Sequence, residues 1–396
     1  MITRVRAKNF RSLADIDVTL GPLTVLVGKN GAGKSAFVDV LGFVRDALTT
    51  SFSEALGKRQ GMERLRFSSA LVEEMLQIGI EVEEPRLPLR GMLHFSLDMH
   101  SNLIYEQGKI YTVEPLETRS PVGMPGDFTD SYMTTNGVLI EEPKIQLFTS
   151  GMNVSSSSAL LMDLSRHSHE YRVLMDFLRG VEIFDVSSEE MRSVQNDRGN
   201  EMQNHQEFFL IENRQILFKM IEFSLYASSS KGGILSFLKL IVPTVTDIRM
   251  SKSAGNLAPE IQHSDGTWRN LKQESDGTVR LLGILCALYQ ILAIPYKKHT
   301  TLIIEEPEIS IYPEYLEVLA NVIREASKDR QIIITTQSPD LISCFSADEI
   351  RVVESVEGQT KIGPLGAHQR EVLNQELFSL GDLLRVEGLW RDDSDA

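Results

Sequence analysis

The stretch that decides the fold is LTVLVGKNGAGKSAFVDVL, at residues 23–41. A short apolar run leads into the glycine-rich octapeptide GKNGAGKS at 28–35, and apolar residues then recur at helical spacing. The octapeptide has the pattern G-x-x-x-x-G-K-[ST] between a strand and a helix, the context in which such a loop binds nucleotide phosphates. Glycines allow backbone N–H groups to curve around phosphate oxygens without a clash from a Cβ atom. The sequence therefore predicts a site for a nucleoside triphosphate near residue 30.

Individual residues of this loop have roles that follow from phosphate chemistry. The helix after the glycines would present its partly positive N-terminus to the phosphates. We expect Lys34 to reach the β- and γ-phosphates and the Ser35 hydroxyl to ligate Mg²⁺. A glycine-rich turn with a chance GKS is the alternative, and the flanking strand and helix argue against it. The residues expected to contact ATP in this loop are Asn30, Gly31, Ala32, Gly33, Lys34, Ser35 and Ala36.

A second motif, LIIEEPE at 302–308, is an apolar strand that ends in carboxylates. In a phosphate-loop protein the first acid at such a strand end holds Mg²⁺, and an acid beside it can deprotonate the attacking water. We therefore assign Glu305 to the metal and Glu306 to the role of general base. An exposed acidic turn is the alternative, but here a buried strand precedes the acids.

The tetrapeptide SDGT occurs twice, at 264–267 and at 275–278. The second copy directly precedes the apolar helix VRLLGILCALYQIL, where Ser275 is a good helix N-cap. Capping alone would explain that serine. Its position shortly before the acidic strand end adds a second interpretation, a turn with a role in the site, which depends on the family resemblance given below. The first copy is followed by Trp268, Arg269 and Asn270, which predicts a plain turn.

The rest of the chain predicts an α/β fold interrupted by other elements. Apolar strands that alternate with helices after residue 244 favour a mainly parallel sheet covered on both faces. Short alternating runs between about 75 and 150 predict an antiparallel β lobe. We expect the N-terminal part of an ATPase head with this lobe at 1–150, a mainly helical insertion at 151–243, and the C-terminal part of the head at 244–396. No sustained heptad pattern is present, so a compact insertion is expected.

The composition limits the partners. The formal net charge is −15, from 40 Lys and Arg against 55 Asp and Glu, so DNA binding would require a local basic patch. Two cysteines give no disulfide framework, and no apolar run is long enough to span a membrane. We expect a cytoplasmic protein without membrane association. The candidate DNA-binding residues, for which a solvated charged surface is the favoured interpretation, are Arg4, Arg6, Lys8, Lys58, Arg59, Arg64 and Arg66.

Taken as a set, several motifs resemble the RecF/OLD/SMC-like branch of ABC-type ATPases. They are NFRS at 9–12, GKNGAGKS at 28–35, SDGTVRLL at 275–282, IIEEPEISIYP at 303–313 and IIITTQSPD at 332–340. The resemblance implies an ABC-type head that dimerises around two ATP and Mg²⁺, with a signature turn in which Ser275 and Gly277 contact the γ-phosphate bound by the other protomer. It also implies that Arg11 touches nucleotide and that the loop 310–313 crosses the dimer seam.

Two residues depart from the family pattern. Gln337 stands where the family usually has His, and Glu305 replaces a more common Asp. Glutamine can donate a hydrogen bond to a γ-phosphate but cannot become cationic, so we expect slow hydrolysis. OLD-type nucleases carry a TOPRIM module after the ATPase, and we expect none in the residues after 346. The position of the usual Q-loop glutamine stays open.

The resemblance leaves two main functions open. One is an ATPase that forms a homodimer or a higher even-numbered assembly and acts on DNA or a partner effector, in DNA repair or anti-phage defence. The other is a nucleotide-bound sensor scaffold that holds and releases a separate toxin or nuclease, with incidental hydrolysis. A small-molecule kinase fits poorly, because it needs neither the signature turn nor the paired glutamates.

Overall fold

A computed structural model describes residues 1–69, 75–84, 89–98, 103–112, 138–141, 169–185, 187–192, 214–253, 256–293, 300–375 and 377–392. The chain forms two compact units. One unit comprises Met1–Leu20, Asp39–Arg179 and Val356–Lys361, and the other comprises Gly21–Val38, Gly180–Ser355 and Ile362–Ala396. Each unit is made of three stretches that are separate in the sequence. The division into consecutive segments at 1–150, 151–243 and 244–396 stays a prediction.

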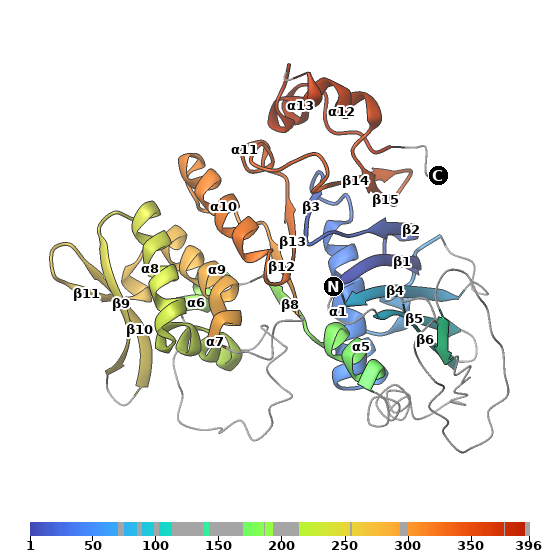
Figure 1. Ribbon diagram of the computed structural model, residues 1–396, viewed down its shortest axis with the longest axis horizontal. Helices are drawn as coiled ribbons and strands as arrows, with labels where there is room; N and C mark the ends of the chain where they lie inside the picture. Colours follow the sequence, from blue (N-terminus) through green and yellow to red (C-terminus); the bar gives the residue numbers. More distant parts are fainter. Residues whose placement is uncertain are drawn as a thin grey trace. The chain divides into compact units, whose positions relative to one another are not determined.

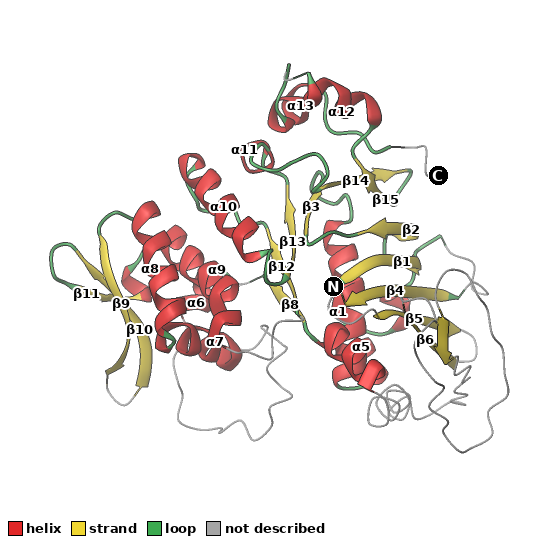
Figure 2. Cartoon of the chain, in the orientation of Figure 1, coloured by secondary structure: helices red, strands yellow, loops and turns green. Residues whose placement is uncertain are grey.

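The second unit contains the phosphate loop and is built on a six-stranded sheet in the order β15-β14-β3-β13-β12-β8 (Figures 1 and 2). The five strands from β14 to β8 run parallel, which confirms the expected mainly parallel α/β sheet. The strands are β3 (Leu23–Val27), β8 (Val181–Phe184), β12 (Thr301–Glu305), β13 (Gln331–Thr336), β14 (Ile350–Val356) and β15 (Gln359–Pro364).

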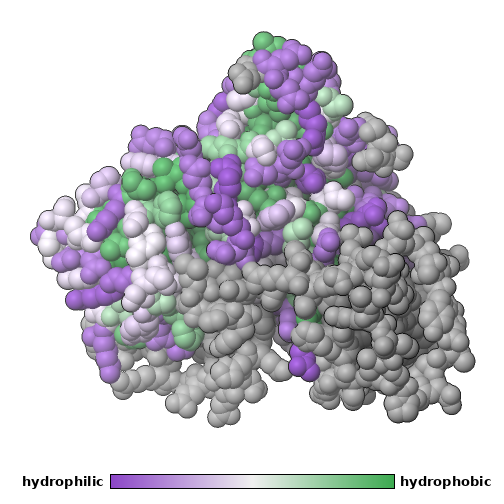
Figure 3. Space-filling model, viewed as in Figure 1, coloured by the Kyte–Doolittle hydropathy of each residue, from purple (hydrophilic) through white to green (hydrophobic). Residues whose placement is uncertain are grey.

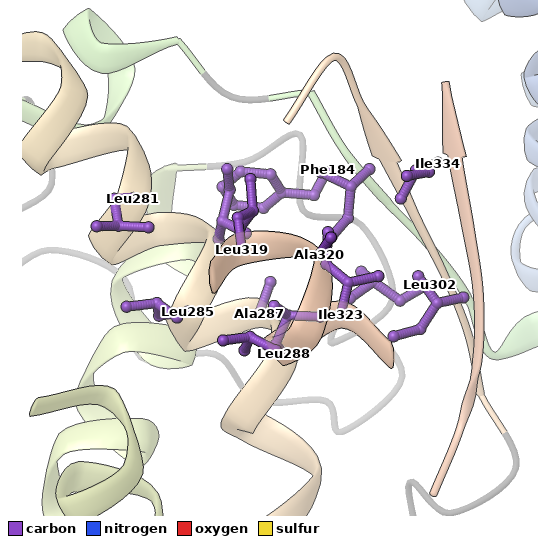
Figure 4. Packing of buried hydrophobic residues seen from close by; sticks show 14 of the residues in the cluster. Phe184, Leu281, Leu285, Ala287, Leu288, Leu302, Leu319, Ala320, Ile323 and Ile334 are labelled. Carbon is purple, nitrogen blue, oxygen red and sulfur yellow. The ribbon is translucent and has the colours of Figure 1, made fainter. Parts of the chain in front are cut away.

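The hydrophobic core of this unit lies between the sheet and its helices. Figure 4 shows buried residues of one cluster that come from two helices and from β8, β12 and β13. They are Leu281, Leu285, Ala287 and Leu288 on one helix, Leu319, Ala320 and Ile323 on the other, and Phe184, Leu302 and Ile334 on the strands. All residues of β3 and β13 are buried, as a parallel sheet covered on both faces requires. The main helices are α7 (Arg214–Tyr226), α8 (Ser228–Ile241), α9 (Asp276–Ala293) and α10 (Leu316–Ala326).

Shorter elements complete this unit. A three-stranded antiparallel sheet in the order β11-β10-β9 packs its β9 strand on α7 and α8. This antiparallel sheet was not predicted from the sequence, which indicated only helices and the buried strands of a parallel sheet after residue 244. The remaining elements are β9 (Val245–Ser253), β10 (Asn256–His263), β11 (Trp268–Asn270), α6 (Ser188–Arg192), η3 (Leu271–Gln273), η5 (Pro313–Tyr315), α11 (Pro339–Ile342), α12 (Ala367–Asn374) and α13 (Leu380–Val386).

The first unit is built on an antiparallel sheet in the order β2-β1-β4-β5-β6-β7, which agrees with the expected β lobe. In its core Phe10, Phe43, Phe52 and Phe95 form a chain of edge-on ring contacts at 6.0, 6.1 and 5.2 Å. The helix α1 (Lys34–Thr49) begins in the other unit and continues here. The other elements are β1 (Ile2–Phe10), β2 (Leu13–Thr19), β4 (Leu76–Glu84), β5 (Leu89–Asp98), β6 (Leu103–Thr112), β7 (Val138–Glu141), α2 (Phe52–Lys58), α3 (Met62–Leu65) and α5 (His169–Arg179).

The strand β8 lies within the region that the sequence analysis expected to be mainly helical. It has four residues and pairs with β12 in parallel. A short apolar run between helices cannot be assigned to a strand from periodicity alone, because a buried helical segment has the same composition. None of the helices in the described part of the chain is long and apolar enough to cross a membrane.

Candidate functional site: a phosphate loop facing a cluster of glutamates

The phosphate loop connects the end of β3 to the start of α1, as its motif predicts. Gly31 and Gly33 have φ values of 75° and 110°, conformations that side chains disfavour. A Cβ atom on Gly28 would lie 2.2 Å from the carbonyl oxygen of Val353 on β14, so the chain also needs a glycine there for close packing. Ala32, Lys34 and Ala36 are buried, whereas Asn30, Gly31 and Ser35 are exposed.

The Lys34 side chain folds back over the loop. Its Nζ donates hydrogen bonds to the carbonyl oxygens of Gly28 at 2.7 Å and Lys29 at 3.2 Å. Burial lowers the pKa of Lys34, and the nearby carboxylates of Glu306, Glu308 and Glu305 oppose that shift. The amine is thus held inside the curve of the loop, close to the backbone that would surround a phosphate.

Ser35 and Glu305 meet at the mouth of the loop. The Ser35 hydroxyl donates a 2.8 Å hydrogen bond to Oε2 of Glu305, at the end of β12. Burial raises the pKa of Glu305, and the negative charges of Asp185 and Glu306 raise it further, while the bond from Ser35 opposes them. A cation bound by this hydroxyl and this carboxylate would reduce the repulsion between Glu305 and the neighbouring negative charges.

Glu306 directly follows the strand in a left-handed conformation, with φ of 45°. Its backbone N–H donates to the carbonyl oxygen of Thr335 on the adjacent strand β13, at 2.9 Å. The structure therefore brings Lys34, Ser35, Glu305 and Glu306 together within one unit, as the motifs predicted. Their chemical roles stay predictions.

Glu308 belongs to the motif at 302–308, but no role was assigned to it from the sequence. Its Oε1 accepts a hydrogen bond from the Thr336 hydroxyl at 2.5 Å, and its other oxygen is buried without a hydrogen-bond partner among the described residues. Burial raises the pKa of Glu308. The backbone N–H of Gln337 also donates to this carboxylate. The exposed Gln337 thus lies at the end of β13, beside the acids that end β12.

The two SDGT copies differ in structure as expected. The Ser275 side chain caps α9 by accepting a 3.2 Å hydrogen bond from the Thr278 N–H. The copy at 264–267 is a turn between β10 and β11, in which Gly266 has φ of 80°. In this turn the backbone N–H of Thr267 donates to Asp265 at 2.8 Å.

Residues of α6 hold the start of the signature turn. Arg192 pairs with Asp276 at 2.6 Å and donates to the carbonyl oxygen of Glu274 at 2.9 Å. The Ser188 hydroxyl also donates to Asp276, at 2.8 Å, and these two contacts lower the pKa of that carboxyl. The side chain of Glu274 also contacts the buried His263, with 2.7 Å between Oε1 of Glu274 and Nε2 of His263. The contacts from Arg192 and Ser188 were not evident from the sequence, because α6 lies far from the signature along the chain.

Arg11 lies in the other unit, where it has φ of 50° and its guanidinium pairs with Asp39 at 2.7 Å. Its expected contact with nucleotide stays a prediction. The loop 310–313, expected at a dimer seam, exposes 74% of Tyr312, and Ser310 has φ of 65°.

The residues present fit a nucleotide with Mg²⁺. This cation prefers hard oxygen ligands and usually takes only one or two from the protein, the others coming from water and phosphate. Ser35 and Glu305 are such a pair, and the orphaned oxygen of Glu308 adds a buried acceptor in the same cluster. Within the described ranges no group of three or more His, Cys, Asp and Glu could hold a metal on its own.

Two family descriptions match the chain. "AAA domain, putative AbiEii toxin, Type IV TA system" matches residues 149–343, and "AAA ATPase domain" matches residues 1–85. An OLD nuclease of Thermus scotoductus (strain ATCC 700910 / SA-01) is 52% identical over 44 residues, which are 11% of this chain and 8% of that relative. The match therefore spans a small part of the relative's length.

Solved structures extend the likeness to the whole fold. The SMC head bound to the C-winged helix domain of ScpA superposes with a TM-score of 0.55 at 14% identity, covering 93% of this chain and 99% of that one. The Smc head with an extended coiled coil, from Pyrococcus furiosus, gives 0.54 at 11% identity, covering 95% and 99%. The fold is that of the SMC heads, and the two matched descriptions are both of AAA-type ATPase domains. In these matched parts and in its fold, the chain resembles OLD- and SMC-like ATPases.

Proposed function

We propose that this chain binds ATP with Mg²⁺, closes as a homodimer around two nucleotides and hydrolyses ATP slowly. The observation that carries the proposal is the convergence of Lys34 and Ser35 at the start of α1 with Glu305 and Glu306 at the end of β12. A buried lysine, a hydroxyl and a row of carboxylates at one edge of a parallel sheet are the groups that binding and hydrolysis of a nucleotide with Mg²⁺ require.

Each residue has a defined part in this reaction. The loop amides and Lys34 would hold the phosphates, with Lys34 exchanging its two loop carbonyls for phosphate oxygens. Ser35 and Glu305 would hold Mg²⁺, which supplies neutralisation of phosphate charge when bound. Glu306 would accept the proton of the attacking water. Gln337 would donate a hydrogen bond to the γ-phosphate without adding a positive charge.

The dimer would close through the signature turn. In this arrangement Ser275 and Gly277 of one protomer would contact the nucleotide held by the loop of the other. The exposed Ile309 and Tyr312, 44% and 74% accessible, lie just after the glutamates and would become buried at the seam. Closure would then be transmitted to DNA or to a separate effector protein.

The basic residues that the structure describes support the binding of DNA less well than the binding of a protein partner. Arg4 and Arg6 pair with Asp17 at 2.5 and 3.2 Å, and Arg6 also pairs with Glu81 at 3.0 Å. Arg59 is nearly buried and pairs with Asp39 and Asp46. These charges are balanced within the unit, which favours the interpretation of a structural, solvated surface over a DNA-binding patch.

The second candidate is the sensor scaffold that holds a toxin or nuclease partner. One observation favours it: large apolar residues are exposed around α13, and Figure 3 shows apolar residues at the surface over the C-terminal helices. Exposed apolar residues in one short segment, here before, at the end of and after α13, are typical of a protein-binding surface. They are Leu377, Phe378, Val386 and Trp390, which are 63%, 48%, 76% and 56% accessible.

The decisive experiment is the solution mass of Glu306→Gln with and without ATP and Mg²⁺, measured by mass photometry. Removing the base should leave binding intact, lower turnover at least about 100-fold and trap the closed dimer. Glu325→Gln is the control and should behave as wild type, because Glu325 is an exposed glutamate of α10 that pairs with Lys328. An assembly that is complete without ATP and does not change would contradict the nucleotide-closed dimer. DNA-stimulated turnover of the wild type would then separate the DNA role from the scaffold role.

A further inference from the structure

Arg280 connects the signature helix to the acidic strand end. It lies in the second turn of α9, five residues after Ser275, and is 6% exposed. Its Nη2 donates to the carbonyl oxygen of Glu305 at 2.8 Å and to that of Glu306 at 3.0 Å. These two carbonyls belong to the peptide groups on either side of the Glu306 Cα atom, so one guanidinium holds both.

Glu306 needs such a hold. Its φ of 45° is in the left-handed region, which residues with a side chain rarely adopt. It also precedes Pro307, a context that favours extended backbone. Backbone strain of this kind persists only where surrounding contacts fix it, and it is common at catalytic groups. The bonds from Arg280, together with the bond from the Glu306 N–H to Thr335, fix the direction in which the carboxylate leaves the backbone.

A second contact connects the start of α9 with the segment that follows β12. A Cβ atom on Gly277 would lie 2.3 Å from the carbonyl oxygen of Ser310, in the loop that follows the glutamates. The signature turn therefore touches that loop with its backbone, one helical turn before Arg280. With these two contacts, the start of α9 and the segment 305–310 move together.

We propose that Arg280 is a positioning residue that couples the signature turn to Glu306 of the same protomer. This inference rests on the proposed nucleotide-bound dimer. There the signature turn serves the partner's nucleotide, whereas Glu306 serves its own. A signature turn that closes on the partner's nucleotide thus sets the geometry of the base in its own site through Arg280. Hydrolysis in each site then depends on closure of the other site, so turnover is cooperative in ATP.

The test compares Arg280→Met, Arg280→Gln and Arg280→Lys with wild type in full-length protein. Affinity for a fluorescent ATP analogue, kcat, KM and the Hill coefficient of turnover are measured, with melting temperature as a check on folding. We expect affinity within about twofold of wild type, because Arg280 does not belong to the phosphate loop. We expect kcat to fall about 10- to 100-fold in the Met variant, and the Hill coefficient to fall from above 1 to about 1. Lys, which keeps a cationic donor, should recover part of both.

The matched control is Arg324→Met. Arg324 also donates through Nη2 to a backbone carbonyl, that of Cys344, but lies on α10 away from the glutamates. It should lose stability without losing kcat or cooperativity. A wild type that does not hydrolyse ATP would refute the proposed function itself. With an active wild type, an unchanged kcat and Hill coefficient in the Met and Gln variants would overturn the inference. So would a non-cooperative wild type, or loss of ATP binding in all three variants, since Arg280 would then serve the fold alone.

Discussion

The Ser35 hydroxyl donates a 2.8 Å hydrogen bond to Oε2 of Glu305, which lies 270 positions later in the sequence. Their meeting follows from sheet order. The strands β3 and β12 lie on either side of β13 and run parallel to it, so the residues that follow them emerge at the same edge. The contact joins the expected phosphate-binding and metal-binding motifs in one site.

The raised pKa of Glu305 predicts a pH-dependent gain in stability for Glu305→Gln. Burial and the charges of Asp185 and Glu306 make the folded protein hold the Glu305 proton more tightly than the unfolded chain does. Below the ordinary value of 4.5 both states are protonated and the carboxylate costs nothing. As pH rises from there through the raised pKa, the wild type loses free energy of unfolding. At neutral pH the variant should therefore be more stable by about 1 kcal/mol, or about 2–4 °C in melting temperature.

Thermal unfolding of nucleotide-free protein across this pH range checks the prediction. Glu325→Gln removes an exposed carboxylate that is 70% accessible and should change stability by less than about 0.5 kcal/mol at any pH. A gain for Glu305→Gln that is as large below pH 4.5 as at neutrality would show that charge is not its cause.

Gly28→Ala should destabilise the protein by about 1–3 kcal/mol and abolish ATP binding. The new Cβ would lie 2.2 Å from a backbone oxygen of Val353, and a backbone atom in a paired strand cannot rotate away. Gly57→Ala is the control, since its Cβ would meet nothing within 4 Å in α2. That change should stabilise by about 0.5–1 kcal/mol. Chemical denaturation measures both, and equal effects of the two substitutions would refute the packing argument.

The two SDGT copies provide a matched pair of glycine substitutions. Gly277→Ala places a Cβ 2.3 Å from the carbonyl oxygen of Ser310, so we expect turnover to fall at least about tenfold while ATP binding persists. Gly266→Ala meets no atom within 4 Å but has φ of 80°, so it should cost about 1–2 kcal/mol of stability and leave turnover unchanged. Steady-state kinetics and melting curves distinguish the two. A greater loss of turnover in Gly266→Ala would mean that the wrong copy has been assigned to the site.

Gln337→His tests the cause of slow hydrolysis. An imidazolium at the end of β13 would add positive charge where negative charge develops on the γ-phosphate. We expect turnover to rise about tenfold, which corresponds to about 1.4 kcal/mol of transition-state stabilisation. The gain should shrink above the histidine pKa, near 6.5 for an unperturbed side chain, as the ring loses its proton. Turnover that is unchanged or lower would show that glutamine is not the brake.

Features that depend on residues close together in the sequence could be predicted, and features that depend on distant segments could not. The phosphate loop, the apolar strand ending in Glu305 and the capped helix at Ser275 depend on neighbours within a few residues, so local patterns sufficed. β8 and β11 were missed because a strand of three or four residues takes its identity from the partner with which it pairs. β9 and β10 were also missed, although with nine and eight residues they have ordinary strand lengths.

The sequence by itself determined the class of the site: glycines between a strand and a helix, a lysine and a serine at the helix start, and carboxylates at a strand end. Only the tertiary structure decided which groups support them. Arg280 holds the backbone of Glu306, Arg192 holds Asp276, and Glu308 carries a buried orphan oxygen, each through contacts between segments far apart in the chain. The physical reason is that hydrogen bonding and burial depend on distance in space. A motif records residue types along the chain, whereas the neighbours that orient them are set by the order of strands in the sheet.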